Sequence, residues 1–115
     1  MATTTALNII KDINGIPSYT LQQSKVIYTG KLTAGVPQSI TAPSDAKYYM
    51  VRIGVTIGAD IFVSVNGTAT LPTGAPTLSA TEINIAQTYV AAGGTISIMS
   101  DAASAYYSLG FYSVV

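Results

Sequence analysis

A stretch of alternating apolar side chains limits the fold of this chain more strongly than any other feature of it. Between Lys47 and Ile57, every second residue is large and apolar. A period of two is the pattern of a β-strand with one buried face, because successive side chains point to opposite faces of a strand. We therefore predict a strand over residues 47–57, with a core face that carries Tyr49, Val51, Ile53, Val55 and Ile57.

Shorter runs with the same alternation predict further strands. These runs cover residues 25–32, 36–41, 61–65, 82–86, 95–99 and 105–114. Asn66-Gly67 is a strong signal for a tight hairpin turn, so we expect residues 68–71 to form the next strand. Short strands separated by turns about every eight to twelve residues predict an all-β fold. The expected architecture is a β-sandwich or a small jelly roll of 7–8 antiparallel strands.

The first 24 residues do not share this pattern. Asn14-Gly15 and Pro17 interrupt them, and we predict an extended N-terminal arm over residues 1–24 followed by one sandwich domain over residues 25–115. A short helix over Ala6–Ile13 is the alternative. If the arm docks on a neighbour, its apolar anchors are expected to be Leu7, Ile9, Ile10 and Ile13. A second irregular segment, Pro72–Ala80, is rich in Pro, Gly and Thr and predicts an ordered surface loop.

The sequence also contains a faint internal repeat. Ala34-Gly35, Ser39-Ile40 and Tyr48-Tyr49 recur 58 positions later as Ala92-Gly93, Ser97-Ile98 and Tyr106-Tyr107. Each copy reads as a glycine turn, a strand, a Ser-Asp turn and a second strand. Two such hairpins would occupy equivalent places in the two halves of a sandwich, and chance among common β residues is the alternative.

Charged residues are scarce. They make up 9% of the chain, five basic and five acidic, with a net charge of zero, whereas an ordinary soluble domain has about 25%. Without a basic patch, binding to nucleic acid or to a membrane surface is not expected. A surface of Ser, Thr, Asn and Gln with no net charge favours contact with neighbouring proteins, including copies of the same chain. A soluble monomer with a Thr/Ser-rich sheet face is the alternative.

The residue types needed for most catalytic sites are missing. The chain has no histidine and no cysteine, which excludes disulfides and removes the usual nucleophile–base pairs and transition-metal ligands. We predict that it is not an enzyme and binds no metal or cofactor. A hydrolase would need a pair of neighbouring carboxylates, and the acids lie apart in the sequence, at Asp12, Asp45, Asp60, Glu82 and Asp101.

The aromatic residues are mostly tyrosine, with eight Tyr, two Phe and no Trp. A tyrosine combines an apolar ring with a polar hydroxyl, which suits an interface. Three of them lie opposite the predicted core positions of their strands. We expect these to be exposed and to line a subunit contact or a sugar-binding surface: Tyr48, Tyr106 and Tyr112.

Several segments together resemble the small virion proteins of tailed bacteriophages. They are residues 33–43 (TAGVPQSITAP), 48–55 (YYMVRIGV), 61–69 (IFVSVNGTA), 81–84 (TEIN) and 91–96 (AAGGTI). The resemblance covers residues 25–115 and implies a head-decoration, head-fibre, collar or tail-associated protein, often trimeric, with a β-sandwich body and a docking arm.

The expected function is therefore structural. The chain would self-associate, with a trimer favoured, and dock on the major capsid protein or on neck or tail proteins of a virion. The alternative is a receptor- or glycan-binding tip module that uses the exposed tyrosines and the Pro72–Ala80 loop. Residues 1–8 have neither a basic region nor a long apolar run, so no signal peptide is expected and synthesis and assembly are predicted in the host cytoplasm.

Overall fold

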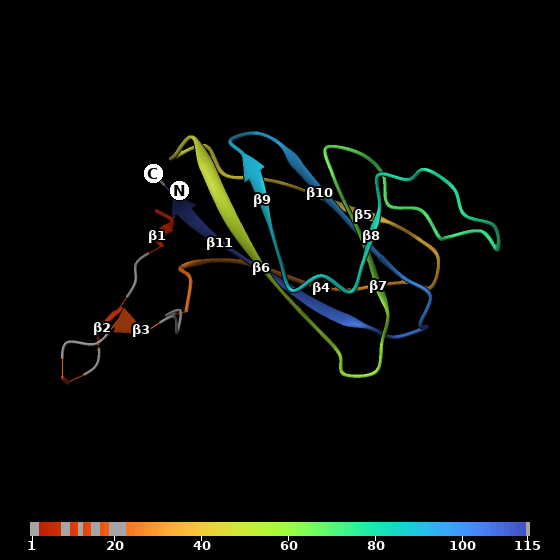
Figure 1. Cartoon of the computed structure of the whole chain (residues 1–115), viewed down its shortest axis with the longest axis horizontal. Helices are drawn as coiled ribbons and strands as arrows, with labels where there is room; N and C mark the ends of the chain where they lie inside the picture. Colours follow the sequence, from red (N-terminus) through yellow and green to blue (C-terminus); the bar gives the residue numbers. More distant parts are fainter. Residues whose placement is uncertain (1–2, 8–9, 12, 15–16, 19–22, 115) are drawn as a thin grey trace.

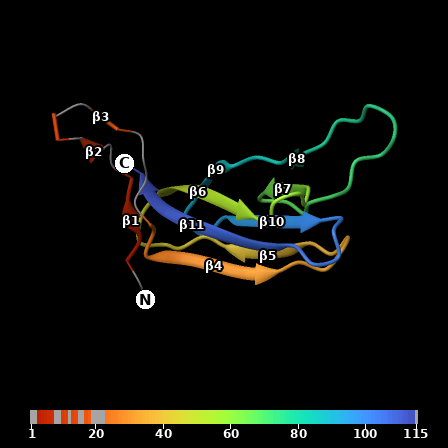
Figure 2. The same ribbon diagram turned by 90° about the horizontal axis from the view of Figure 1, so that it is seen from below.

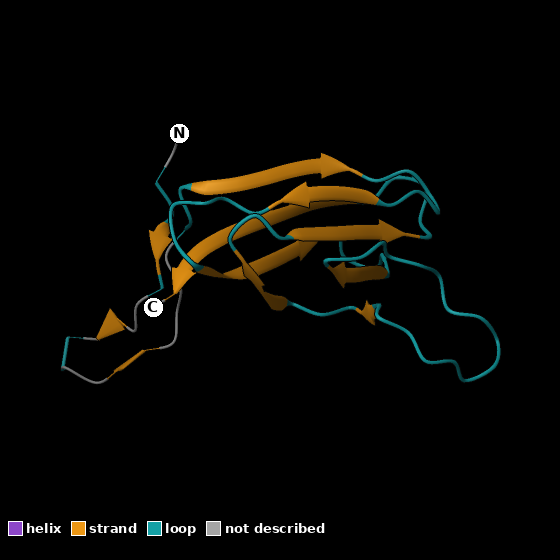
Figure 3. Ribbon diagram, turned by 90° about the horizontal axis from the view of Figure 1, so that it is seen from above, coloured by secondary structure: helices purple, strands orange, loops and turns teal. Residues whose placement is uncertain are grey.

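The computed structural model describes residues 3–7, 10–11, 13–14, 17–18 and 23–114. Within these residues every regular element is a β-strand, which confirms the all-β prediction. Two sheets pack face to face, and the apolar sides of both meet between them (Figures 1 and 2). The molecule measures 50 × 29 × 27 Å, because a segment projects beyond the sheets at each end (Figure 3).

The first sheet has five strands in the order β9-β6-β11, with β4 and β1 both paired along the other side of β11. Its strands are β1 (Thr5–Ala6), β4 (Val26–Lys31), β6 (Tyr48–Val55), β9 (Gln87–Ala91) and β11 (Tyr106–Val114). The second sheet has four strands in the order β5-β10-β7-β8. They are β5 (Gln38–Thr41), β7 (Ile61–Val65), β8 (Glu82–Ile83) and β10 (Thr95–Ser100). A separate short pair, β2 (Ile10–Lys11) with β3 (Pro17–Ser18), lies outside both sheets.

The strands from β4 to β11 pair in a nested order. β4 pairs with β11, β5 with β10, β6 with β9, and β7 with β8, and every one of these pairs is antiparallel. This nested pairing describes one long two-stranded ribbon, in which the first strand, β4, pairs with the last, β11. The ribbon is folded so that β11 also pairs with β6, and β10 with β7. These two additional pairings join the ribbon into the two sheets.

The core forms where the alternating faces meet. Tyr49, Val51 and Ile53 of β6 are buried, as the sequence pattern predicts. The rings of Tyr28 and Tyr49 both meet the buried ring of Phe111 edge-on, with centroids 5.7 and 6.2 Å apart. The second sheet contributes Ile61, Val63, Ile96 and Ile98. Burial of these side chains is the main favourable contribution to folding.

The predicted strand over residues 47–57 ends early. Ile57 is fully exposed, so its expected place in the core is wrong. The strand stops at Val55 because a turn follows, in which Ala59 N–H donates to the Thr56 carbonyl at 3.1 Å. Gly58 adopts a φ of 88° in this turn, and this angle is unfavourable for any residue with a side chain.

The hairpin expected at Asn66-Gly67 does not form, and residues 68–71 are not a strand. Asn66 has the positive φ of a tight turn, 59°, but its backbone N–H donates to the Thr95 carbonyl at 2.8 Å. The chain then crosses the outer face of the second sheet. There Ala69 packs on Phe62 and Met99, which project away from the main core. Covering these two large side chains replaces the pairing that a hairpin would have made.

Two serines beneath this crossing segment allow a matched test. Ser97 Oγ accepts the Ala69 N–H at 2.9 Å, whereas the buried Ser64 Oγ has no hydrogen-bond partner among the described residues. We expect Ser97→Ala to lower the free energy of unfolding by about 1–3 kcal/mol, since a buried N–H loses its acceptor. Ser64→Ala should leave it unchanged or raise it. Urea unfolding measures both, and equal losses for the two variants would contradict this account.

The predicted strand over residues 82–86 is only partly right. β8 has two residues, and the chain then turns at Asn84, which has a φ of 55°. The Asn84 side chain accepts the Ile61 N–H at 2.8 Å and donates to Asp60 at 3.0 Å. After this turn the chain enters the other sheet as β9, a strand that the sequence pattern did not indicate.

The internal repeat corresponds to a geometric relation in the fold. Gly35 and Gly93 have nearly the same left-handed φ, 72° and 75°. Residues 58 positions apart oppose each other directly, Ser39 with Ser97 between β5 and β10, and Arg52 with Gly110 between β6 and β11. The two copies are therefore related by an approximate two-fold axis. The strands of one copy lie in different sheets, so the expected hairpins are instead crossings between sheets.

Candidate interaction surfaces

The start of the chain is held against the sandwich. The Asp45 carboxylate, in the connection between β5 and β6, accepts the Thr4 backbone N–H at 2.7 Å and the Thr4 hydroxyl at 3.0 Å. The Tyr49 hydroxyl also donates to Asp45, at 2.7 Å, and accepts the Ala46 N–H. Two hydrogen bonds hold the pKa of Asp45 below its usual value. The bond from the Thr4 N–H has the largest effect, and the bond from the Tyr49 hydroxyl has the next largest. Burial has the largest effect on the pKa of Tyr49 and raises it, and the hydrogen bond to Asp45 raises it further.

Backbone pairing extends this anchor along the edge of the first sheet. Thr5 is buried beside β11, and its hydroxyl accepts the Lys25 N–H at 2.9 Å. The Leu7 N–H donates to the Ser113 carbonyl at 2.9 Å. Ala6 and Ile10 lie in strands, so the alternative of a helix over residues 6–13 is wrong in the part of that range that the structure describes.

The four predicted arm anchors have different surroundings. Leu7 is 38% exposed beside β11, and Ile13 is fully exposed in the turn between β2 and β3. Ile10 lies in β2, but the structure does not describe its side chain, and Ile9 lies outside the described residues. The division into an arm over residues 1–24 and a body over residues 25–115 stays a prediction.

The anchor at Asp45 makes binding of the N-terminal segment depend on pH. Because folding lowers the pKa of Asp45, the stabilisation is complete above about pH 5 and is lost as the pH falls below about 4. We expect Asp45→Asn to produce the same loosening at neutral pH, seen as faster hydrogen exchange at the Thr4 and Leu7 amides. Asp101→Asn, in an exposed turn, is the control. Unchanged exchange at these amides in Asp45→Asn would contradict the anchor.

An uncharged loop projects from the opposite end of the molecule (Figure 1). Thr70 and Thr81 close its base, with hydroxyl oxygens 3.3 Å apart and the Thr70 N–H donating to Thr81 at 3.2 Å. Every residue between Thr70 and Ala80 is exposed, and Leu78 completely so. The sequence predicted this loop over Pro72–Ala80. We call residues 70–81 the end loop.

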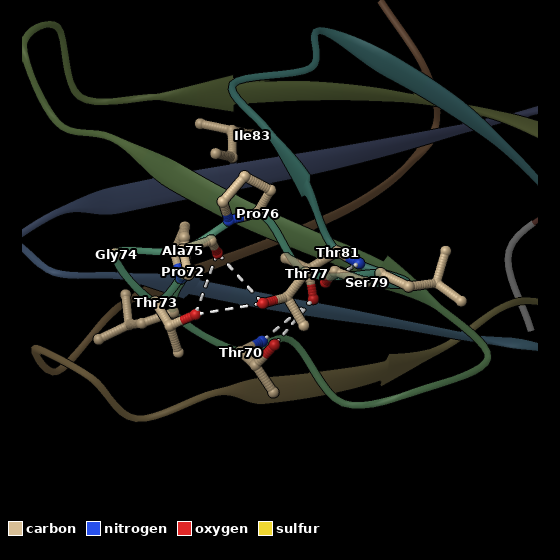
Figure 4. A pocket seen from close by; sticks show the side chains of 12 residues that line it. Thr70, Pro72, Thr73, Gly74, Ala75, Pro76, Thr77, Ser79, Thr81 and Ile83 are labelled. Carbon is tan, nitrogen blue, oxygen red and sulfur yellow. Dashed lines mark hydrogen bonds between the residues drawn. The ribbon is translucent and has the colours of Figure 1, made fainter.

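The end loop encloses a hollow of about 620 Å³ on its inner side. Figure 4 shows threonine hydroxyls gathered there, with Thr73 and Thr77 sharing a hydrogen bond and Thr77 donating to the Ala75 carbonyl at 3.1 Å. These contacts keep the loop in shape without burying its apolar side chains. Ile83, at the edge of the hollow, is also largely exposed.

The predicted surface tyrosines behave differently from one another. Tyr48 and Tyr106 are exposed, as expected, but Tyr112 is only 2% exposed, so its assignment as an exposed aromatic is wrong. Tyr112 is the register partner of Thr5, and the N-terminal segment occupies the edge of the sheet beside it. The sequence pattern did not indicate Tyr89, which is exposed and stacks on Tyr48 with ring centroids 5.4 Å apart.

Tyr106 stands at the rim of a second, shallow hollow of about 590 Å³ on the first sheet. The Lys31 ammonium lies 5.8 Å from the centre of the Tyr106 ring, at a distance suited to a cation–π contact. The hollow exists because small residues occupy neighbouring strands. These are Thr29, Gly30, Gly54 and Ser108. We call this depression the β4 hollow.

The described residues contain no group of three or more acids placed to hold a metal ion. They also contain no helix long and apolar enough to cross a membrane. Comparison with protein-family models, curated proteins and solved structures finds no match for this chain.

Proposed function

We propose that the eight strands from β4 to β11 form a jelly roll. The support is their nested antiparallel pairing, first with last and so on inward, combined with the folding of that ribbon into two four-stranded layers. A jelly roll is an eight-stranded double sheet that contains two Greek keys, and capsid and lectin domains are among the proteins that use it.

For the function, we propose a structural protein of a tailed-phage virion, which associates with itself and docks on the capsid, neck or tail. The observation that carries this proposal is the end loop. It is uncharged, its Leu71 and Leu78 face solvent, and its own body covers none of its residues between Thr70 and Ala80. Exposed apolar side chains gathered in one projection are typical of a surface that a partner covers.

The proposed role involves no catalytic step. The buried faces of the two sheets make a rigid body, and the projections at its ends supply the contacts. Each contact to a neighbour shifts the equilibrium toward the assembled particle by mass action, because a neighbour binds the folded chain and not the unfolded chain. Synthesis and assembly take place in the host cytoplasm, and the mature location is the virion.

The decisive experiment looks for the chain in particles. Virions from the source of the gene are banded in a density gradient and probed with an antibody against the full chain. We expect the chain to band with intact virions in many copies and to resist a wash in moderate salt. Its absence from banded virions, while it is present in the lysate, would reject the proposal.

A receptor- or glycan-binding module is the second candidate, and the stacked pair Tyr48 and Tyr89 favours it. Both rings are about half exposed on the outer face of the first sheet, with Arg52 and Gln87 on the same face. Aromatic faces beside polar groups suit a sugar ring. A glycan array tests this, with Tyr89→Ala as the variant that should lose binding and Ile57→Ala, at a fully exposed position in the turn after β6, as the control. An array without specific binding would reject the module.

A further inference from the structure

A third hollow continues the β4 hollow along the outer face of the first sheet. It measures about 460 Å³, and Arg52 and Tyr112 are among the residues that border it. Gly54 and Ser108 line both hollows, so the two adjoin there and form one depression. This depression follows β11 from Tyr106 to Tyr112, a length of roughly 20 Å for a strand. We call it the β11 trough.

The trough is open because small residues form its floor. Ser108 of β11 pairs with Gly54 of β6 on one side and with Thr29 of β4 on the other. A Cβ at Gly54 would lie 2.7 Å from the Ser108 hydroxyl oxygen. A Cβ at Gly110 would lie 3.5 Å from the Cβ of Ser24. A large side chain at any of these positions would therefore fill the space that the trough leaves open.

The charged residues in the strands of the first sheet are all basic. They are Lys31 of β4 and Arg52 of β6, both exposed, and the five strands contain no acid. Both cations border the trough. Two acids lie beyond the ends of these strands. The Asp45 carboxylate already holds the start of the chain, and Asp101 lies in the connection between β10 and β11. The trough itself therefore suits an anionic ligand.

The positions of the two cations indicate the shape of that ligand. Arg52 and Ile27 both pair with Gly110, from opposite sides of β11. Lys31 lies further along β4 than Ile27, by roughly 13 Å at the usual rise of a strand. An extended chain with anionic groups at intervals can meet both cations without either side chain bending toward the other.

Aromatic rings lie at both ends of the trough. Tyr106 is exposed at one end. At the other end, Met50 of β6 pairs with Tyr112 on one side and with Tyr89 on the other, and Tyr89 stacks on Tyr48. The face of a tyrosine ring suits the apolar face of a sugar, and its hydroxyl suits the polar rim. The ends of the trough therefore favour a ligand made of sugar rings.

Charge density distinguishes an acidic glycan from a nucleic acid. A single-stranded nucleic acid also stacks on aromatic rings, but it has a negative charge at every nucleotide and is bound in a strongly basic groove. The chain has a net charge of zero, and only two cations lie along the trough strands. A polysaccharide with carboxylates at intervals matches this sparse charge.

We propose that the β11 trough binds a linear acidic polysaccharide. The sugar rings lie along β11, Arg52 binds one carboxylate through two N–H groups, and Lys31 binds a second carboxylate further along. Tyr106 stacks on a ring at the end of the trough. The proposal rests on the second candidate function, glycan binding, and specifies its ligand class. It is independent of the virion role.

A glycan array tests the ligand class. It holds uronate and sialate oligosaccharides of several rings, each beside the same oligosaccharide with its carboxylates reduced to alcohols. We expect the chain to bind acidic members, and reduction to weaken that binding about tenfold or more. Equal binding to the reduced forms would overturn the acidic ligand and leave the glycan module intact. An array without specific binding would overturn both. Tighter binding of a single-stranded oligonucleotide would overturn the assignment to a glycan.

Charge removal tests the two cations. Arg52→Gln and Lys31→Gln should each weaken binding to the tightest acidic oligosaccharide about tenfold in low salt. Lys47→Gln removes the same charge from an exposed lysine that borders neither hollow, and it should leave binding unchanged. An equal loss in all three variants would indicate general charge attraction and would overturn the site.

Filling the trough tests its shape without changing its charge. Ser108→Phe places a ring where the two hollows adjoin, and we expect it to abolish binding. Ser39→Phe makes the same change at an exposed position of β5, in the second sheet, and is the control. Urea unfolding checks that both variants are folded. Natural affinity in a folded Ser108→Phe protein would overturn the trough as the binding site.

Discussion

Replacing Ile98 with alanine is expected to lower the free energy of unfolding by about 2–5 kcal/mol, whereas the same replacement at Ile57 should change it by less than about 0.5 kcal/mol. Ile98 is fully buried in β10 between the two sheets, and Ile57 is fully exposed in the turn after β6. The loss at Ile98 combines the apolar surface that returns to water with the cavity that the smaller side chain leaves. The free energy of unfolding of a single domain of this size is about 5–15 kcal/mol, so Ile98→Ala removes a large part of this stability.

Chemical denaturation of the natural chain and of both variants measures this difference. A change in the midpoint at constant slope identifies a stability effect rather than a change in the unfolded state. Both isoleucines belong to runs that alternate in the sequence, so only the structure distinguishes them. Similar losses at the two positions would place Ile57 in a contact that the described fold does not contain.

The second large effect is expected at Gly30, where alanine should cost about 1–3 kcal/mol by overpacking. A Cβ at Gly30 would lie 2.7 Å from the Tyr107 hydroxyl oxygen and 2.8 Å from its Cε1. The Tyr107 ring cannot retreat freely, because it is buried and its hydroxyl donates to Gln38 of the other sheet at 2.8 Å. Gly74→Ala, in the end loop, is the matched control, since nothing lies within 4 Å of its added Cβ.

The titration of the Tyr107 ring, followed by site-resolved NMR, gives a second measurement at this position. Burial raises the pKa of Tyr107. If Gly30→Ala displaces the ring toward solvent, its titration should shift back toward the usual pKa of tyrosine, and Gly74→Ala should leave the titration unchanged. A Gly30→Ala protein with natural stability and natural titration would show that the two strands can separate there at no cost.

Much of the fold was predictable because one physical rule, the alternation of side chains along a strand, acts locally. It located β6, β7, β10 and β11, and it identified the buried residues Tyr49, Val51 and Ile53 of β6. The errors occurred where a distant segment replaced the local preference. Asn66 has the left-handed backbone of a hairpin turn. The residues after it nevertheless form no hairpin strand, because Ala69 packs on the apolar side chains of Phe62 and Met99.

The candidate surfaces were predictable only in part. Composition indicated the loop after Pro72 and the exposure of Tyr48 and Tyr106, since both depend on local polarity and alternation. The stacking partner Tyr89 was missed because Asn84 moves the chain from one sheet to the other, which no local pattern reveals. The anchor between Thr4 and Asp45 joins residues 41 positions apart, so only the folded chain brings them together.

The alternation from Tyr49 to Val55 by itself determined that this chain is built from strands with one buried face. It could not determine where that alternation stops, because Ile57 continues the pattern in sequence but leaves the sheet at the turn before Gly58. The tertiary structure alone decided which strands pair, how the two copies of the repeat cross between sheets, and that Asp45 holds the start of the chain. The physical reason is the distance along the chain over which each effect acts. Side-chain alternation acts between neighbours in the chain, whereas strand pairing and the contacts that anchor a segment depend on residues far apart in it.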